Sequence, residues 1–242
     1  MLSNHFPVRD TVAFVIIDDA DVYVTNAAAM LSGIAREARD HGDHVRAELP
    51  AVTRILLRRP APIGPLLDGV PGPVTIEDVF GPEEPAPSAT VLRLPTMVRP
   101  AGPPAQAPPP GVVQVRDEDG LAVAERVMID GFPFPRYQPV VRGHALPPRL
   151  LGLPGWRFWL AYSDGEPAAA AYTFDDGAAV GLYWLATLAE FRSRGLGRAI
   201  LNRAFEVYPE QPFTLTATEA GLPLYESLGF RTVAIATWYT RS

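Results

Sequence analysis

The sequence of 242 residues contains no cysteine and no lysine, and each absence excludes a group of chemistries. Without cysteine the chain has no thiol nucleophile, no disulfide and no cysteine-bound zinc. Without lysine it has no Schiff-base residue and no phosphate-loop lysine. All 21 basic side chains are therefore arginines, and 27 Asp and Glu residues outnumber them. The net charge of −6 argues against non-specific binding of nucleic acid.

Long hydrophobic runs are absent as well. No apolar stretch approaches the ~18 residues of a membrane span, and residues 1–10 show no basic segment followed by an apolar one. We therefore expect a cytoplasmic protein without a membrane partner. The length suffices for one large or two small domains with their own hydrophobic core.

Prolines are distributed unevenly, since 15 of the 27 lie between Pro60 and Pro110. Proline fixes φ and lacks a backbone N–H, so a dense run of it forms neither a helix nor a central strand. We predict an N-terminal domain over residues 1–99, a proline-rich linker at 100–110 and a second domain over 111–242. A strand is expected at Ala89–Val98, just before the linker.

The N-terminal segment shows a modest α/β pattern. Two apolar runs, Val12–Ile17 and Val22–Thr25, flank an acidic turn and predict a hairpin. A helix is expected over Ala27–Arg39, with Asn26 as its N-cap. His41 and His44 are expected to lie at the C-terminal end of that helix, where histidine interacts favourably with the helix dipole. They are not expected to bind a metal, and no metal site is predicted.

The C-terminal half alternates strands and helices more clearly. Asp-Gly pairs at 164–165 and 176–177 are strong hairpin signals, so they indicate an antiparallel meander. Strands are expected at Val112–Val115, Arg157–Tyr162, Ala168–Phe174, Ala179–Thr187, Phe213–Ala217 and Thr232–Tyr239, and helices at Leu121–Asp130, Gly195–Glu206 and Leu222–Ser227. The predicted fold class is α/β (α+β), with a mixed, mainly antiparallel sheet flanked by helices.

Two motifs stand out in this half: residues 192–197, Arg-Ser-Arg-Gly-Leu-Gly, and residues 224–230, Leu-Tyr-Glu-Ser-Leu-Gly-Phe. The first resembles the pyrophosphate motif of the GNAT superfamily of N-acetyltransferases, although Ala189 stands where proline is frequent in that family. The second is similar to another motif of the same family. The resemblance covers about residues 111–241. Element order alone suggests that the smaller N-terminal α/β domain is a degenerate GNAT copy without a phosphate loop.

The first motif predicts a binding site for acetyl-CoA as cosubstrate. A glycine-containing turn that opens a helix presents free N–H groups and the positive end of the helix dipole to a pyrophosphate. The resemblance implies that the strand entering this turn pairs with the pantetheine arm. The residues expected to bind the cosubstrate are Leu185, Ala186, Thr187, Arg192, Ser193, Arg194, Gly195, Leu196, Gly197, Arg198 and Thr218. The structural alternative is a helix cap with solvated arginines.

Tyr225 is the candidate catalytic residue, because a positioned phenol can protonate a departing thiolate. The resemblance implies the same role, and the alternative is a ring that packs in the core. No general base is visible, since residues 180–184 and 213–216 carry no carboxylate. Asp130, Glu219 and Glu226 are weak candidates. Deprotonation through water, or an acceptor amine of low pKa, removes the need for a base.

These observations predict an N-acetyltransferase in which a primary amine attacks acetyl-CoA directly. The loop residues Phe132, Phe134 and Tyr137 are expected to help form an acceptor pocket, with core packing as the alternative. Two other functions stay open: a non-catalytic acyl-CoA sensor and an O-acyltransferase. The acceptor's identity and a homodimer through the N-terminal half also stay open.

Overall fold

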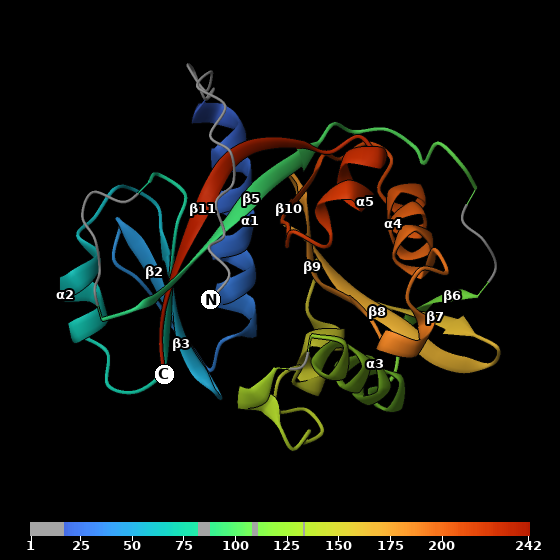
Figure 1. Ribbon diagram of the computed structural model, residues 1–242, viewed down its shortest axis with the longest axis horizontal. Coiled ribbons are helices and arrows are strands. Elements are labelled where there is room, and N and C mark those ends of the chain that lie inside the picture. The colour runs from blue at the N-terminus through green and yellow to red at the C-terminus, as the bar shows by residue number, and fades with distance from the viewer. Residues whose placement is uncertain (1–16, 82–87, 108–110, 133) are drawn as a thin grey trace.

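The computed structural model describes residues 17–81, 88–107, 111–132 and 134–242 (Figure 1). Its strands are β1 (Glu37–Asp40), β2 (His44–Leu49), β3 (Val52–Leu57), β4 (Val74–Asp78), β5 (Thr90–Arg99), β6 (Val112–Val115), β7 (Trp156–Ser163), β8 (Glu166–Asp175), β9 (Val180–Thr187), β10 (Phe213–Thr216) and β11 (Arg231–Arg241). Its helices are α1 (Ile17–Ile34), α2 (Ile63–Asp68), α3 (Glu118–Gly131), α4 (Leu196–Val207) and α5 (Leu222–Ser227), with short 3-10 turns at η1 (Pro135–Tyr137), η2 (Pro148–Gly152) and η3 (Ala189–Phe191).

The described strands form one 11-stranded sheet in the order β1-β2-β3-β4-β11-β5-β10-β9-β8-β7-β6. Only the β3–β4 and β9–β10 pairs are parallel. The prediction of a mixed, mainly antiparallel sheet flanked by helices is therefore confirmed. No helix among the described residues is both long and apolar enough to cross a membrane.

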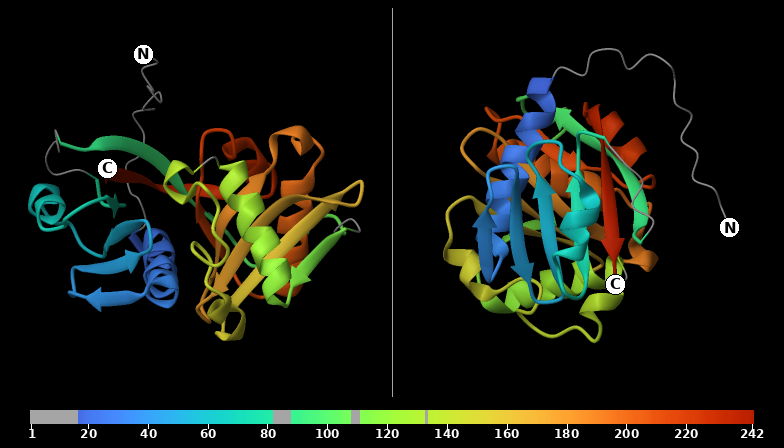
Figure 2. Two further views of the ribbon diagram at one scale, coloured as in Figure 1. Left: turned by 90° about the horizontal axis from the view of Figure 1, so that it is seen from below. Right: turned by 90° about the vertical axis from the view of Figure 1, so that its left-hand side faces the viewer.

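The two halves of the chain share this sheet through β5 and β11. Strand β5, which precedes the proline-rich segment, lies between β10 and β11 and pairs with both. Strand β11 then continues along β4 of the N-terminal half. Figure 1 shows these two strands as the long arrows that join the halves, and the left view of Figure 2 shows the halves side by side.

Helices cover both faces of the sheet. Phe158 shares a core with α1 and α3, whereas the next residue, Trp159, packs with α4 and α5. In the N-terminal half, Leu56 faces α1 and Ile55 belongs to the core beneath α2. Since successive strand residues point to opposite faces, α1 and α3 cover one face and α2, α4 and α5 the other.

The N-terminal hairpin prediction is wrong. Val22–Thr25 lies within α1, and Val12–Ile17 lies outside the described residues except for Ile17. The predicted helix Ala27–Arg39 ends at Ile34, and residues 37–40 form β1. Residues 22–25 are helical because a helix buries the side chains of Tyr23, Ala27 and Leu31, which are four residues apart, on one face.

Two further N-terminal predictions need correction. Asn26 is not an N-cap, since it lies inside α1 and is completely buried. His41 and His44 do not end a helix but flank the β1–β2 turn, where their rings stack with centroids 4.5 Å apart. In the described part of the chain, no group of three metal-ligating side chains comes together.

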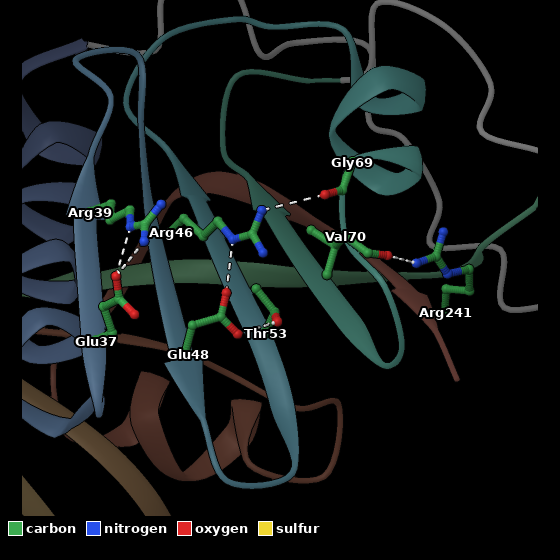
Figure 3. Close-up of polar contacts among 8 residues, drawn as sticks. All are labelled: Glu37, Arg39, Arg46, Glu48, Thr53, Gly69, Val70 and Arg241. Carbon is green, nitrogen blue, oxygen red and sulfur yellow. Dashed lines mark hydrogen bonds and ion pairs between the residues drawn. The ribbon is translucent and has the colours of Figure 1, made fainter.

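A polar network covers the part of the N-terminal sheet that lies beside α2 (Figure 3). Arg46 donates to Glu48 at 2.8 Å, and Thr53 donates to the same carboxylate at 2.7 Å. Arg241, at the end of β11, donates to the carbonyl of Leu67 in the last turn of α2 at 2.8 Å, and to the carbonyls of Val70 and Gly72 after the helix. These contacts fasten the end of β11 to the N-terminal half.

Candidate active site

Strands β9 and β10 separate in the middle of the sheet. They pair only at Val180 with Phe213 and at Gly181 with Thr214. From Leu182 to Thr187, β9 continues along β8 without pairing to β10. The edge of β9 that faces β10 therefore has backbone N–H and C=O groups without a strand partner. An extended ligand can pair with such an edge as an added strand.

A bulge distorts β9 where the strands separate. The β8–β9 register shifts between Ala170 and Tyr172, so two residues of β9, Trp184 and Leu185, oppose one residue of β8. Trp184 has a φ of 52°, which is rare for a bulky residue and costs on the order of 1–3 kcal/mol. Such strain persists only where the surrounding structure holds it.

The loop after β9 leads into the N-terminus of α4. Ser193 and Gly195 both have left-handed backbones, with φ values of 63° and 78°. The first intrahelical bond runs from the Ala199 N–H to the Gly195 carbonyl, so the N–H groups before Ala199 have no helical acceptor. A Cβ on Gly195 would meet no atom within 4 Å, so the space in front of this residue is open.

Gly197 serves a different purpose from Gly195. A Cβ placed there would lie 3.3 Å from Leu224 Cδ2 and 3.6 Å from Leu185 Cδ2. The end of β9, the start of α4 and helix α5 therefore meet at Gly197. The two motifs found in the sequence come together at this point.

The three loop arginines differ in their partners. Arg194 pairs with Asp164 at 2.9 Å and is exposed. Arg192 donates to the carbonyls of Thr187 and Gly131, and Arg198 donates to the Ser227 hydroxyl at 2.7 Å. Among the described residues, neither Arg192 nor Arg198 has a carboxylate partner. No acidic side chain of the described chain therefore neutralises either guanidinium near the start of α4.

Tyr225 lies in α5 with its ring buried in the core shared by α4 and α5. Its ring meets Phe230 edge to face, with centroids 5.6 Å apart. A Cβ at Gly221 would lie 2.9 Å from the Tyr225 ring, so this glycine makes room for it. Burial raises the pKa of Tyr225, which keeps its proton at neutral pH. No hydrogen bond to its hydroxyl occurs within the described chain, and that oxygen is not among the fully buried unpaired atoms.

The weak candidates for a general base lie at the surface. Glu219 and Glu226 are exposed, and Asp130 accepts a hydrogen bond of 3.0 Å from Gln138. Glu125 of α3 is buried, but it accepts three bonds from the backbone N–H groups of residues 143, 145 and 146. It thereby holds that loop in place.

The predicted acceptor loop packs against the β9 bulge. The ring of Phe134 lies 5.1 Å from that of Trp184, and Tyr137 lies 5.8 Å from it. Phe132 stacks on Phe134 at 5.1 Å. Tyr137 is buried and belongs to the core, whereas Phe134 is partly exposed and presents an apolar surface.

Sequence reasoning missed a polar group that the N-terminal half contributes on the same face of the sheet. Glu77 of β4 is buried, accepts a bond of 2.9 Å from Arg54 of β3 and another from the Tyr23 hydroxyl. The Arg54 guanidinium lies 4.6 Å from the Trp238 ring centroid. A buried Arg–Glu pair is visible only once strand register is known, because 23 residues separate the two in sequence.

Comparison with protein families places a known domain at this site. Residues 154–232 match the model of the acetyltransferase (GNAT) domain. This segment contains both motifs, the separated ends of β9 and β10, and Tyr225. A search of curated proteins found no match.

Solved structures share the fold over nearly the whole chain. A GCN5-related N-acetyltransferase from Kribbella flavida is 19% identical, with a TM-score of 0.60 and coverage of 91% of this chain and 95% of that one. A GNAT-family protein from Novosphingobium aromaticivorans is 18% identical, with a TM-score of 0.63 and the same coverage. A GCN5-related N-acetyltransferase from Sphaerobacter thermophilus is 13% identical, with a TM-score of 0.52 and coverage of 82% and 76%. Residues 154–232 are therefore similar to a GNAT acetyltransferase domain, and the chain as a whole shares the fold of these solved structures.

Proposed function

We propose that this protein transfers the acetyl group of acetyl-CoA to a primary amine. The meeting of β9, α4 and α5 at Gly197 carries the proposal, because it brings together the start of α4, the end of β9 that lacks a β10 partner, and the helix that contains Tyr225. The pyrophosphate of acetyl-CoA would bind the N–H groups at the start of α4, with Arg192 and Arg198 supplying charge. The pantetheine arm would lie along the free edge of β9.

In this reaction the neutral amine attacks the thioester carbonyl carbon. A C–N bond forms, the C–S bond breaks, and the thiolate of coenzyme A leaves. The conjugate thiol of coenzyme A resembles that of cysteine, whose pKa is about 8.5. Tyr225 gives its proton to the sulfur as charge develops there and is then reprotonated from solvent. The nitrogen loses its proton through water.

The test is a panel of primary amines in which release of free coenzyme A from acetyl-CoA is followed. The panel includes amino acids, polyamines, aminoglycosides and peptides with a free N-terminus. Release that depends on both an amine and the protein supports the proposal. Binding of acetyl-CoA without release for any amine indicates the sensor instead, and absence of binding contradicts both.

A further inference from the structure

The space between β9 and β10 is open at one end and closed at the other. The two strands pair only at residues 180 and 181 of β9. Residues 180–182 of β9 are buried, whereas residues 183–185 are partly exposed. On β10, residues 213–215 are buried and Thr216 is partly exposed. An extended ligand that lies along the free edge of β9 therefore reaches no further than about Tyr183.

Tyr183 fills the closed end on the face of the sheet that α1 covers. Its hydroxyl donates to Asn26 Oδ1 at 2.7 Å, and its side chain folds back over Gly181. A Cβ at Gly181 would lie 2.5 Å from Cε2 and 2.6 Å from the hydroxyl oxygen of Tyr183. The ring also stacks on that of Tyr172, with centroids 5.3 Å apart. These contacts hold the ring in one position.

Asn26 is itself held in place. Its amide nitrogen donates to two backbone carbonyls of the β8–β9 hairpin, and its side chain is completely buried. Tyr183 therefore loses a hydrogen bond if its ring moves aside, because Asn26 cannot follow it. A buried donor left without its acceptor costs more than the bond itself contributes.

The opposite face of the closed end is filled by the core that α4 and α5 cover. Leu182 of β9 and Leu215 of β10 belong to this core, and both are buried. Protein interiors are close-packed, so a ligand that passes between the strands to this face must displace buried side chains. The closed end is thus filled on both faces of the sheet.

The length of the pantetheine arm brings the acyl group to this closed end. The proposed function, on which this inference rests, puts the pyrophosphate at the start of α4 and the arm along β9. About twelve bonds join the phosphate oxygen to the sulfur, as many as in four extended residues, or roughly 13–14 Å. A strand advances about 3.3 Å per residue, so an arm that begins beside Thr187 would bring the sulfur beside Tyr183.

We infer that Tyr183 closes the acyl end of the site and restricts the cosubstrate to acyl-CoA thioesters with two or three acyl carbons. Between the sulfur and the strand pairing at Gly181 lie two residues of β9, or about 6–7 Å, and the Tyr183 ring occupies part of this length. A hexanoyl chain extends about 5 Å beyond an acetyl group and meets the ring. Asn26 is a positioning residue, because it acts through the Tyr183 hydroxyl.

The test is calorimetric titration of acetyl-, propionyl- and hexanoyl-CoA without an amine. In the wild type, propionyl-CoA is expected to bind within about threefold of acetyl-CoA, and hexanoyl-CoA at least tenfold more weakly. In Tyr183→Ala, hexanoyl-CoA should bind within about threefold of acetyl-CoA. Tyr183→Phe keeps the ring and retains at least a fivefold preference for acetyl-CoA. Tyr162→Ala, on the exposed part of β7, keeps the wild-type preference.

Tyr183→Leu, which keeps an apolar side chain in the core, is the second variant if Tyr183→Ala does not fold, and it should reduce the preference at least threefold. Equal affinity of the wild type for acetyl- and hexanoyl-CoA overturns the inference and leaves the proposed function standing. An unchanged preference in the folded variant without the ring also overturns it. Selective binding that this variant abolishes supports the inference even if no amine is turned over. Absence of binding of every acyl-CoA contradicts both the inference and the proposed function.

Discussion

The Tyr183 hydroxyl donates a hydrogen bond of 2.7 Å to Oδ1 of Asn26, and this contact ties α1 of the N-terminal half to β9 of the C-terminal half. The Asn26 amide nitrogen donates to the carbonyls of Phe174 and Ala179, at 3.2 and 3.0 Å. A Cβ at Gly181 would lie 2.0 Å from Asn26 Oδ1, so a glycine is required beneath it. Asn26 thus holds the β8–β9 hairpin just before the bulge.

Asn26→Leu is expected to lower the free energy of unfolding by roughly 2–4 kcal/mol. The substitution removes the acceptor of the Tyr183 hydroxyl and the Asn26 donor to two carbonyls, of which that of Ala179 still accepts from the Asp176 N–H at 3.2 Å. Each buried group left without a partner costs about 1–3 kcal/mol. Urea unfolding followed by circular dichroism measures the change. In a double-mutant cycle, Tyr183→Phe should cost less in the Asn26→Leu background than in the wild type. A loss below about 0.5 kcal/mol would show that the contact is dispensable.

Arg198→Gln is expected to weaken acetyl-CoA binding by roughly 3- to 10-fold, because Arg198 has no competing carboxylate in the described chain. Arg203→Gln is the matched control on the same helix, since Arg203 pairs with Glu206 one turn beyond. Calorimetric titration at low and high salt measures both variants. Equal affinities of the two variants for acetyl-CoA would show that Arg198 does not contribute to binding.

Tyr225→Phe is expected to lower kcat by roughly tenfold or more and to leave the KM for acetyl-CoA close to that of the wild type. The substitution removes one oxygen and keeps the ring contact with Phe230. The hydroxyl matters as charge develops on sulfur, so ground-state binding changes little. Tyr162→Phe, on the exposed part of β7, is the control. An unchanged kcat, with chemistry shown to limit the rate, excludes Tyr225 as the acid.

Stability is expected to fall steeply above about pH 10. Burial raises the pKa of Tyr23, Tyr172 and Tyr225, so folding favours their neutral phenols. The stabilisation is fully present below the ordinary tyrosine pKa and is lost as the pH rises through the higher folded-state values. Each tyrosine contributes a slope of about 1.4 kcal/mol per pH unit in that window.

Tyrosine is the side chain that titrates between pH 8 and 12 in this protein, because the sequence has no lysine or cysteine and arginines stay charged. Phenolate absorbance and circular dichroism are therefore recorded together between pH 8 and 12. Most of the eight tyrosines should ionise in step with unfolding. Ionisation of all of them near pH 10 in a folded protein would contradict the burial.

The C-terminal elements were predictable because their signals are local. The Asp-Gly turns and the two motifs located β7 to β9, α4 and α5 within about two residues of their observed bounds. Site-residue predictions for the loop at 192–198 remain predictions, although the structure shows an open, left-handed turn there.

The N-terminal half was not predictable in the same way. The β-branched run at Val22–Thr25 favours a strand locally, but one face of α1 packs on the sheet and overrides that preference. The insertion of β5 between β10 and β11 joins residues more than 100 positions apart, for which no local pattern exists. The Arg54–Glu77 pair depends on the parallel register of β3 and β4, which no local pattern reveals either.

The central claim is that one acyl-CoA binds each chain, at the start of α4. Calorimetric titration of acetyl-CoA into the wild type, Gly195→Val and Gly177→Val tests it most directly. Both glycines have left-handed backbones, with φ values of 78° and 92°, and open space in front, but Gly177 lies in the β8–β9 turn at the opposite end of β9. We predict one site per chain in the wild type and Gly177→Val, and binding at least tenfold weaker in folded Gly195→Val. Unchanged binding by Gly195→Val, or a second acyl-CoA bound by the N-terminal half, would contradict the account.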